Sequence, residues 1–96
     1  MNDTMLHLIA YDIPQELPRI RNKLHKLLGR YGTWTQFSLF ECFLTKKQSV
    51  KLIDEIKTLL KQETGHVRIY VLSKDDVERT ITLGGTPPHE PNTYIF

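Results

Sequence analysis

Hydrophobic and polar positions along this chain follow two periods, one typical of strands and one typical of helices. An apolar run that ends at Ala10 is apolar on both faces, which predicts a buried central strand over residues 5–12. Residues 34–44 are rich in aromatic side chains and predict one long strand. Alternation predicts a third strand over 66–73 and a fourth over 78–83.

Two stretches repeat their apolar residues at three- and four-residue spacing, as a helix with one buried face does. The first begins near Pro18, which suits the first turn of a helix, and ends near Gly29. The second covers roughly residues 46–62, where Thr45 and Gln48 match a capping box at its start. The sequence therefore predicts two helices between and after the first strands.

The predicted order is βαβ, then α, then ββ, which favours an α+β fold. The nearest common arrangement is the ferredoxin-like sandwich of βαββαβ type, an antiparallel sheet with two helices on one face. We expect residues 1–83 to form this domain. Residues 84–96 are expected to form a separate Gly/Pro-rich arm that ends in a C-terminal strand.

The arm has an unusual composition. Residues 84–91 hold two glycines and three prolines, which favour a sharp turn followed by extended backbone. Thr93, Tyr94, Ile95 and Phe96 then add strong strand formers, three of them large and apolar. Such an arm can reach about 25 Å, so we expect its strand to be exchanged with a second copy in a homodimer. The alternative is a frayed terminus.

Charge is distributed unevenly over the 96 residues, although the net charge is only +2. Residues 17–30 carry five cations and no acid. Neighbouring like charges on a helix repel one another, so this face is costly unless it meets an anion such as phosphate. We therefore predict that it binds nucleic acid, the alternative being an ordinary solvated face. The predicted nucleic-acid-binding residues are Arg19, Arg21, Lys23, Lys26 and Arg30.

The single cysteine, Cys42, excludes an internal disulfide, which fits a reducing compartment. Its simplest interpretation is a small apolar residue within a strand. The N-terminal apolar run is too short for a signal peptide or a membrane span. We accordingly expect a cytoplasmic protein without membrane contact.

Asp12 stands where the first predicted strand ends, directly before the basic helix. A lone carboxylate beside groups that suit phosphate indicates a divalent metal, Mg²⁺ or Mn²⁺, which could activate water and polarise a phosphodiester. One aspartate per chain supplies too few ligands for a metal site, whereas a symmetric dimer supplies two carboxylates. The alternative is that Asp12 caps the loop that follows it. No zinc pattern or glycine-rich phosphate loop accompanies it.

Several short motifs keep their order over nearly the whole chain. They are Tyr11-Asp12-Ile13, Arg21-Asn22-Lys23, Gln36-Phe37-Ser38-Leu39-Phe40-Glu41, Val67-Arg68-Ile69-Tyr70 and Gly84-Gly85. No single one is specific, but in combination and at this length they resemble the small CRISPR-associated adaptation proteins called Cas two.

The resemblance implies ferredoxin-like homodimers whose sheets pack face to face and whose C-terminal strands cross between protomers. It also implies that Asp12 of both protomers meets at the two-fold axis, where a divalent metal can bind. Some members of that family are described as metal-dependent nucleases for single-stranded RNA or double-stranded DNA. Others act without evident catalysis, as the central dimer of a complex with the Cas one integrase that captures spacer DNA.

Our first interpretation is therefore a dimeric CRISPR adaptation protein that binds DNA or RNA and assembles with an integrase. Whether it is also a metal-dependent endoribonuclease or endonuclease, with Asp12 as both catalytic and metal-binding residue, stays open. Two alternatives remain: a toxin-like ribonuclease of the same fold, and a non-catalytic ferredoxin-like module for dimerisation or regulation.

Overall fold

The structure is a computed structural model that describes residues 3–61 and 65–90. Its elements, in chain order, are β1 (Met5–Asp12), α1 (Pro18–Gly29), β2 (Thr33–Gln36), β3 (Leu39–Leu44), α2 (Lys46–Leu60), β4 (His66–Leu72) and α3 (Lys74–Glu78).

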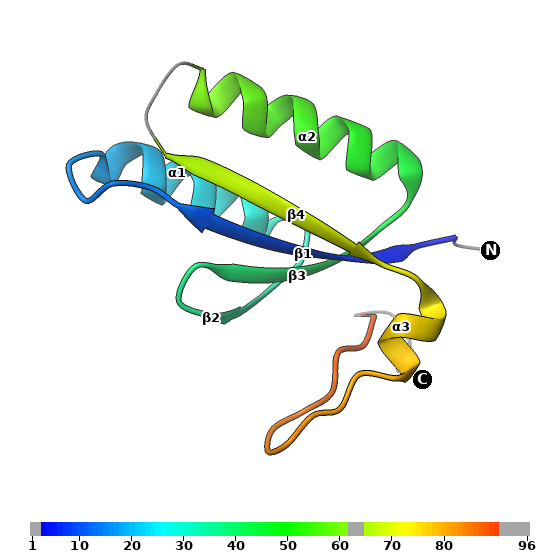
Figure 1. Cartoon of the computed structure of the whole chain (residues 1–96). Helices are drawn as coiled ribbons and strands as arrows, with labels where there is room; N and C mark the ends of the chain where they lie inside the picture. Colours follow the sequence, from blue (N-terminus) through cyan, green and yellow to red (C-terminus); the bar gives the residue numbers. More distant parts are fainter. Residues whose placement is uncertain (1–2, 62–64, 91–96) are drawn as a thin grey trace.

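The four strands form one antiparallel sheet in the order β2-β3-β1-β4. The helices α1 and α2 cover one face of it, and α3 with the chain that follows lies on the other side (Figure 1). This is the α+β, ferredoxin-like arrangement that the sequence predicts. The predicted central position of the first strand is also confirmed, because β1 pairs with β3 on one edge and with β4 on the other.

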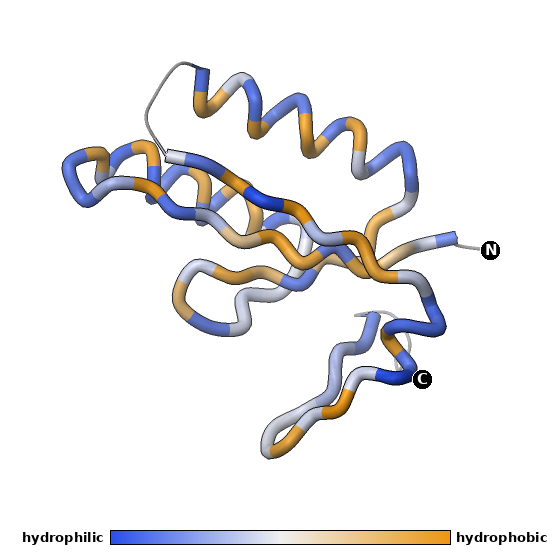
Figure 2. Tube along the Cα trace, viewed as in Figure 1, coloured by the Kyte–Doolittle hydropathy of each residue, from blue (hydrophilic) through white to orange (hydrophobic). Residues whose placement is uncertain are grey.

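The core lies between the sheet and the two long helices. In Figure 2 the turns of α2 are hydrophobic on the side toward the sheet and hydrophilic on the other. Ile9 of β1 and Phe40 of β3 are almost inaccessible to solvent, as are Leu24 and Leu28 of α1. Cys42 is buried beside them, and this burial raises the pKa of its thiol to about 12. Cys42 is therefore the inert apolar residue that its place in a strand predicts.

The single long strand predicted over residues 34–44 is wrong. The segment is a hairpin of β2 and β3 with its turn at Phe37 and Ser38. The Trp34 indole Nε1 donates to the carbonyl of Phe37 at 2.7 Å, and the Thr35 hydroxyl donates to the carbonyl of Leu39 at 3.1 Å. Side-chain hydrogen bonds thus close a turn that contains no glycine, proline or asparagine, so the usual turn signal is absent.

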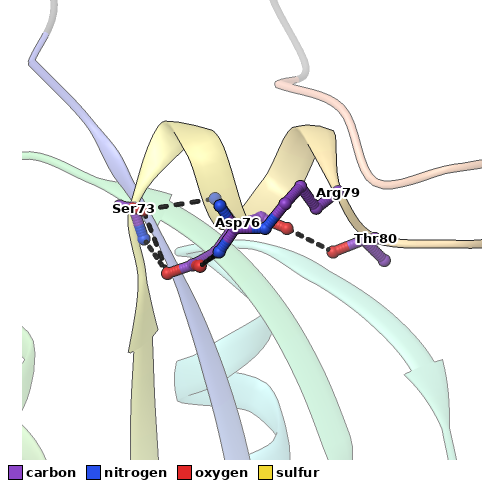
Figure 3. Close-up of polar contacts among 4 residues, drawn as sticks. All are labelled: Ser73, Asp76, Arg79 and Thr80. Carbon is purple, nitrogen blue, oxygen red and sulfur yellow. Dashed lines mark hydrogen bonds and ion pairs between the residues drawn. The ribbon is translucent and has the colours of Figure 1, made fainter.

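The strand predicted over residues 78–83 is also wrong within the described part of the chain. Ser73 and Asp76 form a capping box that begins the short helix α3. The Asp76 carboxylate accepts from Arg79 at 2.6 Å, and the Thr80 hydroxyl donates to the Asp76 carbonyl at 2.8 Å (Figure 3). These local bonds stabilise the helix up to Glu78, and residues 79–90, which include most of the predicted strand, follow without regular structure.

The predicted capping box of the second long helix is confirmed. The backbone N–H of Gln48 donates to the Thr45 hydroxyl at 3.2 Å, and the backbone N–H of Thr45 donates to the side-chain Oε1 of Gln48 at 2.9 Å. This helix ends at Leu60, whereas the sequence predicts an end near residue 62, which lies outside the described residues. The predicted C-terminal strand at 93–96 lies outside them as well. No described helix is long and apolar enough to cross a membrane.

Two glycines near the end of α1 allow a matched test of core packing. A methyl group on Gly32 would overlap the Glu41 carbonyl and the Cys42 sulfur, whereas one on Gly29 would meet nothing within 4 Å. We expect Gly32→Ala to lower the free energy of unfolding by about 1–3 kcal/mol. Gly29→Ala should leave it unchanged or raise it by up to about 1 kcal/mol. Urea denaturation of both variants measures the difference; equal effects would contradict this packing.

Candidate functional site

Alternation along β1 assigns its side chains to two different surfaces. His7 faces the helices, because its Nε2 lies 3.0 Å from the Ser49 hydroxyl of α2, and Tyr11 belongs to the buried core on the same side. Since successive strand side chains point to opposite faces, Leu8 and Asp12 lie on the other face of the sheet, here called the open face. Asp12 is exposed at the end of its strand, as the sequence predicts.

Strand register brings two further polar side chains to the same end of the open face. Asp12 lies directly opposite His66, and Ala10 lies opposite Arg68. Directly opposite residues of an antiparallel pair share a face, so Asp12, His66 and Arg68 adjoin one another there. The sequence alone does not indicate His66, because its spacing from Asp12 along the chain carries no metal-ligand signal. The antiparallel pairing of the first strand with β4 is what brings the two residues together.

Gly65 permits this approach of β4 to the end of β1. It has a φ of +108°, which side chains other than glycine rarely tolerate. A Cβ at this position would lie 2.9 Å from the Asp12 carbonyl oxygen and 3.0 Å from Pro14. A larger residue would therefore separate His66 from Asp12.

The carboxylate of Asp12 is available to a ligand from outside the chain. Among residues 3–61 and 65–90, no hydrogen bond or ion pair uses it. Within the same residues, no cluster of three or more His, Cys, Asp or Glu side chains could hold a metal. One chain thus supplies a single carboxylate with an imidazole beside it. This fits a cation that keeps several waters, such as Mg²⁺, and only when a second chain adds its own Asp12.

The predicted basic surface is divided between two sides of α1. Lys23, Lys26 and Arg30 line a groove of about 490 Å³ between α1 and α2, and the opposite wall of this groove carries Asp54 and Glu55. Arg30 Nη2 lies 3.9 Å from a carboxylate oxygen of Glu55. The acid-free segment of sequence is therefore not an acid-free surface, because α2 brings two acids to three of its cations.

Arg19 and Arg21 do not line this groove. Arg21 lies close enough to Tyr11 for its positive charge to act on the phenol. Burial raises the pKa of Tyr11, while a hydrogen bond with Ser38 and the charge of Arg21 oppose that rise. The Tyr11 hydroxyl also lies 3.1 Å from Nδ1 of His25. Arg21 thus lies near Tyr11, the residue that precedes Asp12 on β1.

The open face is covered at one end only. Leu6 and Phe43 line a cavity of about 250 Å³ that is closed by Val77 of α3 and by residues 88–90. The same segment passes Glu41, whose pKa is raised by burial and lowered in part by the charge of His89. At the other end, Asp12 remains exposed.

Comparison with known proteins identifies the family to which this architecture belongs. The profile described as CRISPR associated protein Cas2 matches residues 5–80. A protein of Synechocystis sp. named CRISPR-associated endoribonuclease Cas2 1 is 45% identical over 94 residues, which are 96% of this chain and 100% of that relative. The crystal structure of Streptococcus pyogenes Cas2 at pH 6.5 has a TM-score of 0.71 and 31% identity, covering 83% of this chain and 100% of its own.

A solved assembly described as a partial Cas6-RT-Cas1–Cas2 complex holds a chain with a TM-score of 0.75 and 29% identity, covering 96% of this chain and 99% of that one. The profile match and the full-length relative show that this chain belongs to the CRISPR associated protein Cas2 family.

Proposed function

We propose that this chain is the nucleic-acid-binding dimer of CRISPR spacer acquisition and that it assembles with a Cas1-type integrase. The observation that carries the proposal is the end of β1, where Asp12 exposes its carboxylate on the open face and Tyr11, on the helix-covered face, has Arg21 as a neighbour. The Cas2-family fold and its likeness to a chain from a complex containing Cas1 support the same function. We also propose that the protein acts in the cytoplasm, where the nucleic acid and the integrase are.

Dimer formation is supported by apolar surface that this chain leaves uncovered. Ile81 is 82% exposed and Leu83 is 91% exposed, on the loop that projects away from the sheet (Figure 2). The strand β4 lies at one edge of the described sheet, with β2 at the other, and has one unpaired edge. In our proposal the open faces of two copies pack together, and the alternating segment 80–83 adds to the edge of β4 in the partner. The arm at 93–96 would extend this exchange.

A dimer of this kind completes the site at Asp12. Two carboxylates that meet across a symmetry axis repel each other, and a divalent cation between them relieves the repulsion. When bound, Mg²⁺ or Mn²⁺ would activate a water molecule and polarise the phosphodiester. Arg21 would hold the phosphate backbone, and the His66 imidazole stands beside the carboxylate as the adjacent proton acceptor. Cleavage of RNA or DNA is then the enzymatic part of the proposal.

A non-catalytic scaffold is the second candidate. It is favoured by one observation, the small number of metal-capable side chains at Asp12 within the described part of a single chain. Both candidates share the dimer and the basic contacts of α1, so they differ only in whether Asp12 supports cleavage.

Replacement of Asp12 separates the enzyme from the scaffold. Asp12→Asn keeps the size of the side chain and removes its charge, so fold, dimer and most of the nucleic-acid affinity should be retained. Metal-dependent cleavage of RNA or DNA should fall to the background rate, measured at equal Mn²⁺ or Mg²⁺. Asp3→Asn, at an exposed aspartate that precedes β1, is the control and should cleave like the parent. Equal cleavage by Asp12→Asn and the parent would support the scaffold.

The division of the α1 cations predicts unequal effects on duplex binding. Arg21→Ala should weaken binding of any duplex sequence and reduce the slope of log affinity against log salt by about one unit. Lys26→Ala should change both quantities less, because Asp54 and Glu55 share its groove. Fluorescence anisotropy over a salt series measures the slopes. A larger effect of Lys26→Ala would contradict this prediction and would indicate that nucleic acid binds in the groove between α1 and α2.

The exchanged segment predicts which apolar side chains hold the dimer together. The double variant Ile81→Asp/Leu83→Asp should be monomeric at concentrations where the parent is dimeric, because each buried side chain contributes on the order of 1.5–3 kcal/mol. The control is Val50→Asp, because Val50 lies on α2 and its side chain is 55% exposed; this variant should remain dimeric. Sedimentation velocity across a dilution series reports both; a dimeric double variant would place the interface elsewhere.

A further inference from the structure

The β2–β3 hairpin exposes two aromatic rings that the proposed function does not use. Trp34 is 54% exposed and Phe37 is 86% exposed, and we call this pair the aromatic tip. Residues 33–38 contain no charged side chain. A large exposed ring gives up the free energy of burial, so two of them on one short hairpin need an explanation other than folding.

Phe37 is an unfavourable residue for its own turn. Its φ is +46°, a left-handed conformation in which a bulky side chain is strained and which glycine or asparagine adopts more readily. The turn nevertheless holds it there, because the Trp34 indole donates to the Phe37 carbonyl at 2.7 Å. The ring therefore projects into solvent on a fixed turn. Strain combined with exposure indicates a ring kept for contact with a ligand.

Contacts with core residues hold the Trp34 ring in place. It lies opposite Phe40 in the hairpin register, and Phe40 is only 1% exposed on the helix-covered side. His25 of α1 packs edge-on against both rings, with centroids 6.0 Å from Trp34 and 5.0 Å from Phe40. The hydroxyl of Tyr11 lies 3.1 Å from the same imidazole. Trp34 is therefore held against α1 on the side of the sheet where that helix lies.

The aromatic tip borders the cation that we assign to phosphate. Arg21 precedes His25 by four residues on α1, so the two side chains neighbour each other on the same helix face. His25 in turn contacts Trp34. A nucleic-acid strand whose phosphate lies at Arg21 would thus have a base within the neighbourhood of the aromatic tip. Positive charge beside uncharged aromatic rings complements a phosphate backbone with its bases, whereas an apolar protein surface would leave the guanidinium without a partner.

We propose that Trp34 and Phe37 form a stacking platform for an unpaired base of DNA or RNA, next to a backbone phosphate held by Arg21. The inference rests on the proposed nucleic-acid binding and adds to it a preference for a junction between duplex and single strand. Bases inside a duplex have both faces covered by their neighbours, whereas an unpaired base can turn a face to these rings.

Trp34 is the only tryptophan of the chain, so its fluorescence reports on the platform directly. The full-length protein is titrated with one blunt DNA duplex and with the same duplex carrying short 3′ overhangs of deoxythymidine or of uridine. We expect the overhang duplexes to quench Trp34 and to bind more tightly than the blunt duplex, which should quench it little. The two overhang chemistries distinguish DNA from RNA as the source of the base.

Two substitutions of Phe37 separate stacking from folding. Asparagine tolerates the left-handed turn without a ring, so Phe37→Asn should stay folded and lose about five-fold or more in affinity for the preferred overhang duplex. Its affinity for the blunt duplex should be unchanged. Phe37→Tyr keeps a ring and should restore the overhang preference.

Each remaining outcome overturns the inference. Blunt-duplex binding without overhang preference or Trp34 quenching would remove the platform and leave the proposed function standing, whereas no binding to any probe would remove both. A changed oligomeric state of Phe37→Asn with unaltered DNA affinities would instead assign the aromatic tip to a contact with a second copy.

Discussion

The strand β1 is hydrogen-bonded to a neighbouring strand along both of its edges, and this pairing decides where the candidate site residues lie. Alternation along the strand then sends Tyr11 into the core and Asp12 to the open face. A shift of one residue in register would exchange these two surfaces and bury the carboxylate without a partner, which is costly. The site at Asp12 is therefore held by the same backbone hydrogen bonds that hold the sheet.

The register also explains why β4 begins with a histidine that directly follows a glycine. Gly65 takes a positive φ close to the Asp12 carbonyl, and the next residue faces the Asp12 side chain across the strands. Asp12, His66 and Arg68 consequently gather on a surface that is open at this end. An exposed carboxylate beside potential cations interacts weakly in water, but it becomes a strong ligand once a partner or a phosphate displaces that water. In a single chain, Asp12 therefore stays exposed to water, and a strong interaction requires a second molecule.

On the helix-covered side, the cluster of Tyr11, His25, Phe40 and Trp34 connects the core to the surface. Tyr11 and Phe40 are buried, and their stacked rings have centroids 6.5 Å apart, while Trp34 is half-exposed. His25 touches all three, through a hydrogen bond to Tyr11 and edge-on contacts to the rings. Because close-packed rings resist displacement, the hairpin and α1 hold a fixed geometry relative to each other. Trp34 is thereby held on the same side of the sheet as α1, the helix that carries Arg21.

Local sequence signals predicted much of the fold. The apolar run before Asp12 predicted the central strand, and the Thr45–Gln48 capping box predicted the start of α2, because both depend on residues close in the chain. The hairpin turn at Phe37 escaped prediction, since side-chain hydrogen bonds rather than turn-forming residues close it. The alternation of apolar and polar residues over 78–83 predicts a strand that the structure does not form. The capping box of Ser73 and Asp76 instead begins a short helix just before this segment.

For the candidate site, the sequence by itself determined which groups are chemically available: one carboxylate at a strand end and five cations between residues 17 and 30, four of them on α1. Only the tertiary structure decided how they combine. The antiparallel register placed His66 beside Asp12, although the two residues lie far apart in the chain. Packing of α2 against α1 brought Asp54 and Glu55 to three of the cations and left Arg21 on the other side. The physical reason is that charges act through distance in space, and spatial neighbours far apart in the chain are set by strand register and helix packing, which no local pattern encodes.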